Sequence, residues 1–256
     1  MPDRALFLQH DVVAQVQERL SEVNRTFTDV AVVTAEPALW QAELPAARIV
    51  ADGPVLDLVP GSADLVIHAL CLHWADDPVG QIVQCARALR PDGLFLAALF
   101  GGRTLHELRA CLAEAEVAET GGLSPRVLPM GEIRDLGGLV QRAGLALPVA
   151  DSDLRRVTYR DALHLMADLR SMGETSALHA RQRRFTRRSV IAGAAARYAK
   201  GFVQPDGRVP ATFEIIYLTG WAPHQDQQKP LRPGSAAIRL ADALQSRESP
   251  LPDGTS

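Results

Sequence analysis

The sequence predicts an α/β fold: a mostly parallel sheet with helices on both faces and a helical insertion. Segments 64–70 and 94–100 are rich in apolar residues, as expected of strands that are covered on both faces. Residues 76–90 lie between them and show a helical pattern. A strand, a helix and a second strand at this spacing indicate a parallel pair with a right-handed crossover. With 256 residues, 47% of them hydrophobic, the chain can bury one sizeable core, with or without a small attached lobe.

The elements on either side of this unit follow from periodicity and from turn residues. Residues 11–23 place apolar side chains at helical spacing, and Asp11 can cap the start of that helix. The Pro-Asp-Gly sequence at 91–93 favours a turn, and Gly144 suits the end of a helix over 132–143. The other expected elements are strands at 30–34, 48–51, 145–158 and 211–220, helices at 37–44 and 103–118, a Gly/Pro-rich loop at 119–130 and a helical stretch at 160–200.

We expect one domain over residues 1–222, with the helical insertion at about 160–200, and a C-terminal tail at 223–256. The tail is rich in Gln, Pro and Ser, which predicts that it is ordered only in part. The predicted core of the sheet consists of apolar side chains from the two central strands, namely Leu65, Val66, Ile67, Leu94, Phe95, Leu96 and Leu99.

Composition excludes several classes of protein. The net charge is −3, so bulk charge gives no argument for a nucleic acid or an anionic membrane as partner. The three cysteines, Cys71, Cys85 and Cys111, form no Cys-x-x-Cys pair, which argues against a disulfide framework and a thiolate zinc site. The run 94–100 is too short to span a bilayer, and the first residues do not resemble a signal peptide. We therefore expect a cytoplasmic protein without a transmembrane segment.

Common catalytic motifs are also missing from the sequence. It contains no Gly-x-Ser-x-Gly, no Walker loop and no Gly-x-Gly-x-x-Gly. The pair His106-Glu107 lacks the second histidine of a His-Glu-x-x-His zinc site, so no metal is expected.

Two central stretches carry a resemblance to a known fold. Residues 64–78 combine Asp-Leu-Val-Ile with a later Leu-His-Trp and Asp-Asp-Pro, and residues 88–95 are Ala-Leu-Arg-Pro-Asp-Gly-Leu-Phe. The first stretch resembles the fourth strand and following loop of class I S-adenosylmethionine (SAM) methyltransferases, and the second resembles the turn into their fifth strand. The resemblance implies a shortened, Rossmann-like methyltransferase sheet, with SAM as the cofactor.

A closer resemblance extends from about residue 12 to residue 237. It is carried by Phe-Gly-Gly-Arg-Thr-Leu-His-Glu-Leu-Arg at 100–109, Gly-Gly-Leu-Ser-Pro at 121–125, Asp-Leu-Gly at 135–137 with Arg-Ala-Gly at 142–144, Met-Gly-Glu at 172–174, Pro-Ala-Thr-Phe-Glu-Ile at 210–215 and Gly-Ser-Ala at 234–236. These segments resemble the complex I assembly-factor family, which in turn resembles the malonyl-carrier-protein methyltransferase of the type 11 group. The mitochondrial assembly factors are associated with hydroxylating an arginine of a complex I subunit. The resemblance suggests a bacterial cytosolic relative.

The sequence departs from this family at the cofactor loop. Class I methyltransferases follow their first strand with a Gly-x-Gly-x-Gly loop, because only bare backbone can approach the cofactor closely. Residues 29–38 here, Asp-Val-Ala-Val-Val-Thr-Ala-Glu-Pro-Ala, contain no glycine. One alignment puts Thr34, Glu36 and Ala38 on the glycine positions, so that side chains crowd the site of the methionine half of SAM.

A second alignment assumes that the first strand and its loop were deleted. Segment 30–34 is then the second strand, and Glu36 falls where an acidic residue normally accepts hydrogen bonds from the ribose. The stretch between Phe27 and Asp64 is shorter than expected for the family, which favours the deletion. On either alignment Asp52 ends the third strand, and the resemblance places its carboxylate near the adenine amino group.

The resemblance and the sheet topology together indicate a binding edge at the strand ends. The expected cofactor-site residues are Glu36, Asp52, Leu70, His73, Trp74, Phe100 and Gly101. His73 could act as a base or line the site, Trp74 could stack on the adenine, and Arg103 could hold an acidic group. His73 and Arg103 are therefore the catalytic candidates. His68 is expected to be structural.

Two function classes remain open. The chain is either a SAM-dependent methyltransferase of unknown substrate with a degenerate or deleted glycine loop, or a non-methylating assembly factor or arginine-hydroxylase-like protein that acts on a respiratory complex subunit. The retained 64–102 region favours the first class and the glycine-free loop favours the second. Residues 181–188 hold five arginines in eight positions, which could bind an acidic protein partner or form a solvated helix face.

Overall fold

The computed structural model describes residues 6–227 of the chain. Most of the expected tail at 223–256, and the Gly-Ser-Ala motif at 234–236, lie outside the described residues. Within residues 6–227 no helix is both long enough and apolar enough to cross a membrane.

The six-stranded sheet is mixed, with the strand order β2-β1-β3-β4-β6-β5. Four strands are mutually parallel, whereas β6 runs antiparallel to both β4 and β5. The mostly parallel α/β prediction is therefore confirmed, and an antiparallel pair completes the sheet. The strands are β1 (Val30–Thr34), β2 (Arg48–Ala51), β3 (Ala63–Ala69), β4 (Leu89–Phe100), β5 (Ala146–Tyr159) and β6 (Val209–Trp221).

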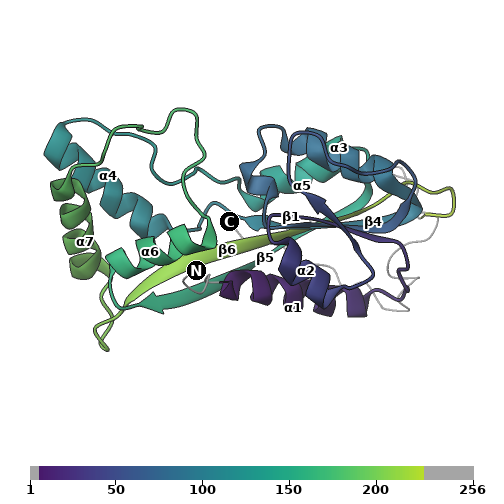
Figure 1. Cartoon of the computed structure of the whole chain (residues 1–256), viewed down its shortest axis with the longest axis horizontal. Helices are drawn as coiled ribbons and strands as arrows, with labels where there is room; N and C mark the ends of the chain where they lie inside the picture. The colour runs from purple at the N-terminus through teal and green to yellow at the C-terminus, as the bar shows by residue number, and fades with distance from the viewer. Residues whose placement is uncertain (1–5, 228–256) are drawn as a thin grey trace, which may run out of the picture. The chain divides into compact units, whose positions relative to one another are not determined.

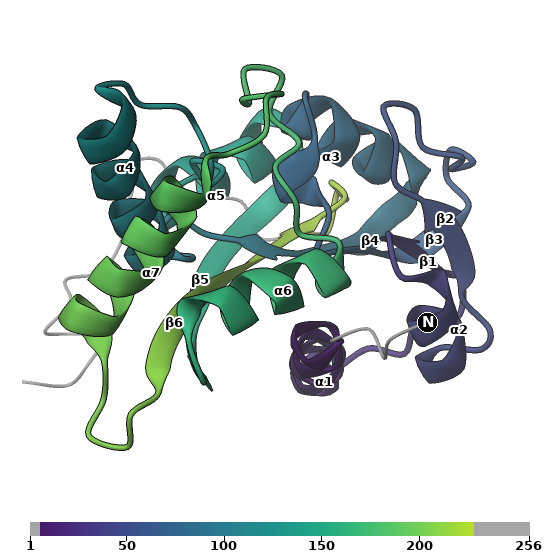
Figure 2. The same ribbon diagram turned by 60° about the vertical axis from the view of Figure 1, so that its left-hand side comes forward.

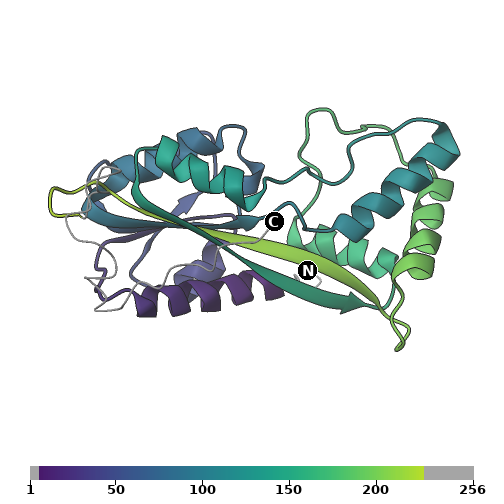
Figure 3. The same ribbon diagram turned by 180° about the vertical axis from the view of Figure 1, so that it is seen from behind.

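Helices cover both faces of the sheet (Figure 1). The helices α1 (Phe7–Glu22) and α2 (Pro37–Glu43) lie on one face, and α3 (Pro78–Ala88) and α5 (Ile133–Arg142) lie on the other, as the view from behind also shows (Figure 3). The remaining helices, α4 (His106–Thr120), α6 (Ala162–Met172) and α7 (Arg188–Phe202), gather beside the long β5–β6 pair, where α4 packs against α7 (Figure 2). A short 3-10 turn, η1 (Leu72–Trp74), follows β3.

The predicted core of the sheet is confirmed. All seven expected side chains are at most 2% exposed, and they divide between the two faces. Leu65, Ile67, Leu94 and Leu96 face α1 and the helices beside it, whereas Val66, Phe95 and Leu99 face α3 and α5. The alternation follows from the two-residue repeat of a strand, and helices on both faces explain why neither set is polar.

Two local expectations at the ends of elements were wrong. Helix α1 begins at Phe7, so Asp11 lies inside the helix instead of capping it. The turn predicted at 91–93 is a bulge inside β4, where the pairing with β3 jumps from Leu89 to Leu94 and Asp92 has a φ of 63°. Gly93 is required there, because a Cβ at this position would lie 2.9 Å from the carbonyl oxygen of Arg90.

The helical stretch predicted at 160–200 is interrupted. α6 ends at Gly173, whose φ of 88° stops the helix, and α7 begins only at Arg188. Four of the five clustered arginines therefore lie in the loop at 173–187 and the fifth begins α7, so the expected solvated helix face does not exist. Phe185 within this loop is fully exposed.

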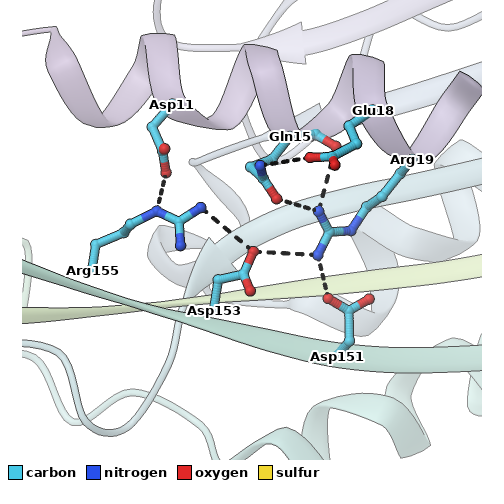
Figure 4. Close-up of polar contacts among 7 residues, drawn as sticks. All are labelled: Asp11, Gln15, Glu18, Arg19, Asp151, Asp153 and Arg155. Carbon is cyan, nitrogen blue, oxygen red and sulfur yellow. Dashed lines mark hydrogen bonds and ion pairs between the residues drawn. The ribbon is translucent and has the colours of Figure 1, made fainter.

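A charged network fastens α1 to the edge strand β5 (Figure 4). The guanidinium of Arg19 pairs with Asp151 and lies 3.5 Å from Asp153, while its carbon Cζ stands 3.6 Å from the centre of the Tyr217 ring. About two turns earlier on α1, Asp11 accepts a 2.8 Å hydrogen bond from Arg155 of β5. Because side chains of both signs alternate between helix and strand, the network fixes the helix over β5 and β6.

We expect Arg19→Ala to lower the free energy of unfolding by about 1–3 kcal/mol, because it removes a partly buried ion pair and a stacked guanidinium together. Chemical denaturation measures the loss. Arg156→Ala on the same edge strand is the matched control, since Arg156 is exposed. A double-mutant cycle with Asp151→Ala should give a clearly favourable coupling energy. Equal losses for the Arg19 and Arg156 variants would contradict this role of the network.

Candidate functional site

The carboxyl ends of the parallel strands meet at one edge of the sheet, where open α/β sheets bind ligands. Glu36 follows β1, Asp52 follows β2, His73 and Trp74 follow β3, and Gly101 follows β4. The residues expected from the sequence thus share one edge. Their contacts nevertheless divide them into two groups, one closed by hydrogen bonds and one beside a cavity.

The closed group is a hydrogen-bonded series of polar side chains that starts at Asp52, which is partly exposed, and continues to the buried Gln81, His68 and Cys71. The amide Nε2 of Gln81 donates to Oδ1 of Asp52 at 3.2 Å and to the carbonyl oxygen of Gly53 at 2.9 Å. Its Oε1 lies 2.8 Å from Nε2 of His68 and must accept that proton. Nδ1 of His68 is then free to accept from the thiol of Cys71, whose sulfur lies 3.5 Å away. Each of these four side chains therefore has a hydrogen-bond partner.

The protonation states agree with this assignment. Burial lowers the pKa of His68 to about 4, so the ring is neutral near neutral pH. Burial also raises the pKa of the Cys71 thiol, and the carboxylate of Asp52 raises it further. The ligand atoms of Asp52, His68 and Cys71 lie within 4.8 Å of one another, a spacing that could hold a metal ion. In the contacts present, Cys71 pairs with His68 and Asp52 pairs with Gln81, so these side chains form a hydrogen-bonded series.

The segment after β1 turns directly into α2. The backbone N–H of Glu36 donates to Oγ1 of Thr34 at 3.0 Å, and Pro37 begins the helix. The Glu36 side chain is only 8% exposed, and Trp40 in the next turn is fully buried. Side chains therefore occupy this end of β1.

The second group lines a cavity of about 290 Å³. His73, Trp74 and Phe100 from the strand ends form one wall, and α4, α6, α7 and the loops at 126–130 and 174–177 supply the rest. The ring centres of His73 and Phe100 are 4.9 Å apart, and those of His73 and Trp74 are 5.8 Å apart, both edge to face. Three of the expected site residues are thus brought together here.

His73 is the polar centre of this wall. Its side chain is 3% exposed, and its Nε2 lies 3.6 Å from a carboxylate oxygen of Glu174 and accepts a hydrogen bond from the indole N–H of Trp74. A neutral ring that accepts at Nε2 carries its proton on Nδ1. Nδ1 is buried and has no partner within residues 6–227. A buried donor without an acceptor costs about 1–3 kcal/mol, so a ligand that accepts there would be stabilised.

Four of the expected site residues line no part of this cavity. Besides Glu36 and Asp52, Gly101 packs on β6, since a Cβ there would lie 2.6 Å from both Glu214 and Ile216. Glycine at 101 is thus required by strand packing. Leu70 instead borders a second cavity of about 10 Å³. The catalytic candidate Arg103 is also apart from the main cavity: its side chain is exposed, and its backbone N–H donates to Glu214 at 2.9 Å.

Arg126 joins the two loops at the cavity. Its guanidinium donates to Glu116 of α4 at 2.6 Å, to Gln182 at 2.9 Å and to Thr186 at 2.8 Å. The hydrogen bond from Arg126 is the main cause that lowers the pKa of Glu116 to about 2, and Ser124 lowers it further. One buried ion pair therefore holds the arginine-rich loop beside the cavity that Arg126 itself lines.

Sequence reasoning did not identify Gln81, Arg126 or Glu174 as site residues. Glu174 belongs to the Met-Gly-Glu segment that carries the family resemblance, so a signal for it was present. Gln81 and Arg126 are set among ordinary helical and loop residues, and only their tertiary contacts reveal them.

Comparisons with known proteins agree with this architecture. A family model for a methyltransferase domain matches residues 13–97. The mitochondrial arginine hydroxylase NDUFAF5 of Danio rerio is 39% identical over 201 residues, which is 78% of this chain and 62% of that protein. The malonyl-[acyl-carrier protein] O-methyltransferase of Xylella fastidiosa is 36% identical over 179 residues, 70% of this chain and 58% of that protein.

The chain therefore spans about three fifths of the length of these curated relatives. Among solved structures, a protein of Bacillus halodurans assigned as a methyltransferase superposes with a TM-score of 0.53 at 13% identity, covering 83% of this chain and 99% of that one. At this identity the superposition shows a shared fold.

Replacing Glu116 by Gln should loosen the arginine-rich loop, because the neutral amide no longer compensates the charge of Arg126. We expect faster tryptic cleavage after the arginines at 181–188, measured by mass spectrometry. Glu119→Gln, at an exposed position of the same helix, is the control. The lowered pKa of Glu116 means that its stabilisation is fully present above its ordinary pKa of 4.5 and is lost as the pH falls through about 2. Unchanged cleavage in the Glu116 variant would refute the assignment.

Proposed function

We propose that this chain, which belongs to the class I SAM methyltransferase-like family, is a non-methylating assembly factor that binds a protein client in the cytoplasm. The client we propose is a subunit of a respiratory complex that presents an acidic surface. The observation that carries the proposal is the bond between Gln81 and Asp52, which engages the carboxylate that relatives are expected to offer to adenine.

The cofactor that the family implies does not fit the residues present in the standard pose. An adenine amino group at Asp52 would have to share the carboxylate with Gln81, whose amide donates to Oδ1 of Asp52 and to the neighbouring carbonyl of Gly53. The methionine end of SAM would meet the side chains of 34–38, where no residue is glycine. On the alignment without a deletion, Glu36 and the carboxylate of SAM at ~4 Å would repel by about 4 kcal/mol at an effective dielectric of ~20.

The arginine-rich loop supports a client of acidic surface. From Thr175 to Pro205 the chain has seven basic residues and no acidic one, although its net charge is −3. Clustered positive charge of this kind steers an acidic partner and gives a salt-dependent association rate. The exposed ring of Phe185 lies among these charges and offers an apolar anchor.

Because relatives of this chain are arginine hydroxylases, we include an arginine of the client as a contact of the site. Glu174 is the carboxylate in the cavity lining, and its side chain is 19% exposed, so a guanidinium could reach it from solvent. This contact would place the arginine next to His73.

A working methyltransferase is the second candidate. It is favoured by the aromatic wall of His73, Trp74 and Phe100 at the carboxyl ends of the strands and by the identity to malonyl-carrier-protein methyltransferases. Methyl transfer needs little side-chain chemistry beyond alignment of the two reactants, so the lack of an evident catalytic group does not count against it.

Calorimetry of the full chain with SAM and with S-adenosylhomocysteine separates the two candidates. We expect no saturable heat at micromolar ligand, because the loop is crowded and Asp52 is already engaged. Adenosine alone, and the variant Gln81→Ala, test whether a freed Asp52 recovers an adenosine contact. A dissociation constant near micromolar for either cofactor form in the parent protein would establish the methyltransferase instead.

Reversing the charge of Arg183, Arg184, Arg187 and Arg188 to glutamate should weaken the complex with the client, and should remove much of the salt dependence of binding seen in the parent. Co-purification from the native host at two ionic strengths measures both effects. Reversing Arg183 and Arg184 alone can be compared with the same reversal at Arg134 and Arg142, exposed on α5, because these two variants have equal net charge. Client recovery that is equal in the loop variant and the parent would refute a role for the loop.

A further inference from the structure

The interior of the 290 Å³ cavity is mainly apolar, which neither SAM binding nor a charged client surface requires. Leu108 and Leu112 lie on one face of α4, and Leu105, the residue before the helix, extends them into a leucine stripe. Leu169 of α6, Ile191 of α7 and Phe213 of β6 are among the other apolar side chains of the lining. At 1.5 Å per residue the stripe runs for about 10 Å, so the apolar wall is elongated. An apolar wall of this kind accepts apolar ligands.

Polar groups without partners lie in the same lining. Nδ1 of His73, Oγ of Ser176 and Nε of Arg126 are all buried and form no hydrogen bond within the described part of the chain. Their presence around one apolar space indicates a ligand that has a polar end.

The unpartnered groups of the lining favour an anionic end. Nδ1 of His73 and Nε of Arg126 are N–H donors, which a head group that accepts hydrogen bonds would satisfy. Arg170 also lines the cavity and forms no ion pair among residues 6–227. It is therefore available to a carboxylate or phosphate.

We propose that the cavity binds an amphiphile with a medium-length aliphatic chain and an anionic head group, such as a fatty acid. The chain lies along the leucine stripe of α4, and the head group pairs with Arg170. This inference goes beyond the client-binding function, and it concerns the part of the sheet edge that Asp52 and Glu36 do not line.

Calorimetry of the full chain with decanoate, decanol and decylamine, each below its aggregation limit, tests the proposal. We expect saturable binding of decanoate, weaker binding of decanol and the weakest binding of decylamine, with a change in tryptophan emission because Trp74 lines the cavity. Failure of both decanoate and decanol to bind would overturn the cavity assignment. Tightest binding of decylamine would overturn the anionic head group.

Two pairs of variants on or beside α6 locate the ligand. Leu169→Phe fills the cavity and should weaken decanoate by roughly tenfold or more, whereas Leu163→Phe, exposed on the same helix, should not. Arg170→Gln should abolish the preference for decanoate over decanol, and exposed Arg160→Gln should keep it. Thermal melting checks that each variant folds. If Leu169→Phe does not fold, the Arg170→Gln and Arg160→Gln pair still tests the proposal. An unchanged preference of Arg170→Gln for decanoate over decanol would refute it.

Discussion

The hydrogen bond from Gln81 to Asp52 is the interaction on which the interpretation of this site depends. Gln81 lies in the first turns of α3, which Asp77 caps by accepting from the backbone N–H of Gly80 at 2.8 Å. From there its amide reaches the end of β2 and the imidazole of His68 in β3 at once. A buried amide that satisfies all of its donors and acceptors is costly to displace, because each freed group loses a partner in a site of low dielectric.

The hydrogen bonds of Gln81 divide the edge of the sheet into two halves. On the side of β1 and β2, the polar groups bond to one another, and Thr34, Glu36 and Trp40 are buried. On the side of β3 and β4, the helices beside the long β5–β6 pair leave a cavity whose polar groups lack partners. The Arg126–Glu116 pair then holds a strongly basic loop next to that cavity. The cavity and the unpartnered polar groups of the described residues thus lie at the half of the edge formed by β3 and β4.

The sheet could be predicted from the sequence because its evidence is local. The apolar runs in β3 and β4 and the caps of α3 and α5 identify those elements without any tertiary information. The bulge at Asp92 could not be predicted, since a Pro-Asp-Gly sequence favours a turn and only the pairing with β3 and β6 extends the strand through it. The arginine-rich loop was misjudged because arginine is a good helix former, although Gly173 was a local signal for the end of α6.

The site was less predictable than the fold. His73, Trp74 and Phe100 follow strands whose ends must converge, so topology alone brings them together. The cavity also needs Arg126, Leu169, Glu174 and Ile191, which are distant in sequence and approach only through helix packing. The partner of Asp52 lies 29 residues away on α3, and no pattern in the sequence connects the two.

Hydrogen–deuterium exchange on the full chain, alone, with its co-purified client and with S-adenosylhomocysteine, tests whether the client and not the cofactor binds at this edge of the sheet. We expect the client to slow exchange at 126–130 and 173–188, next to the cavity, and S-adenosylhomocysteine to change nothing at 34–40 or 51–53. Slower exchange at 34–40 and 51–53 with S-adenosylhomocysteine, and none at 173–188 with the client, would contradict this expectation.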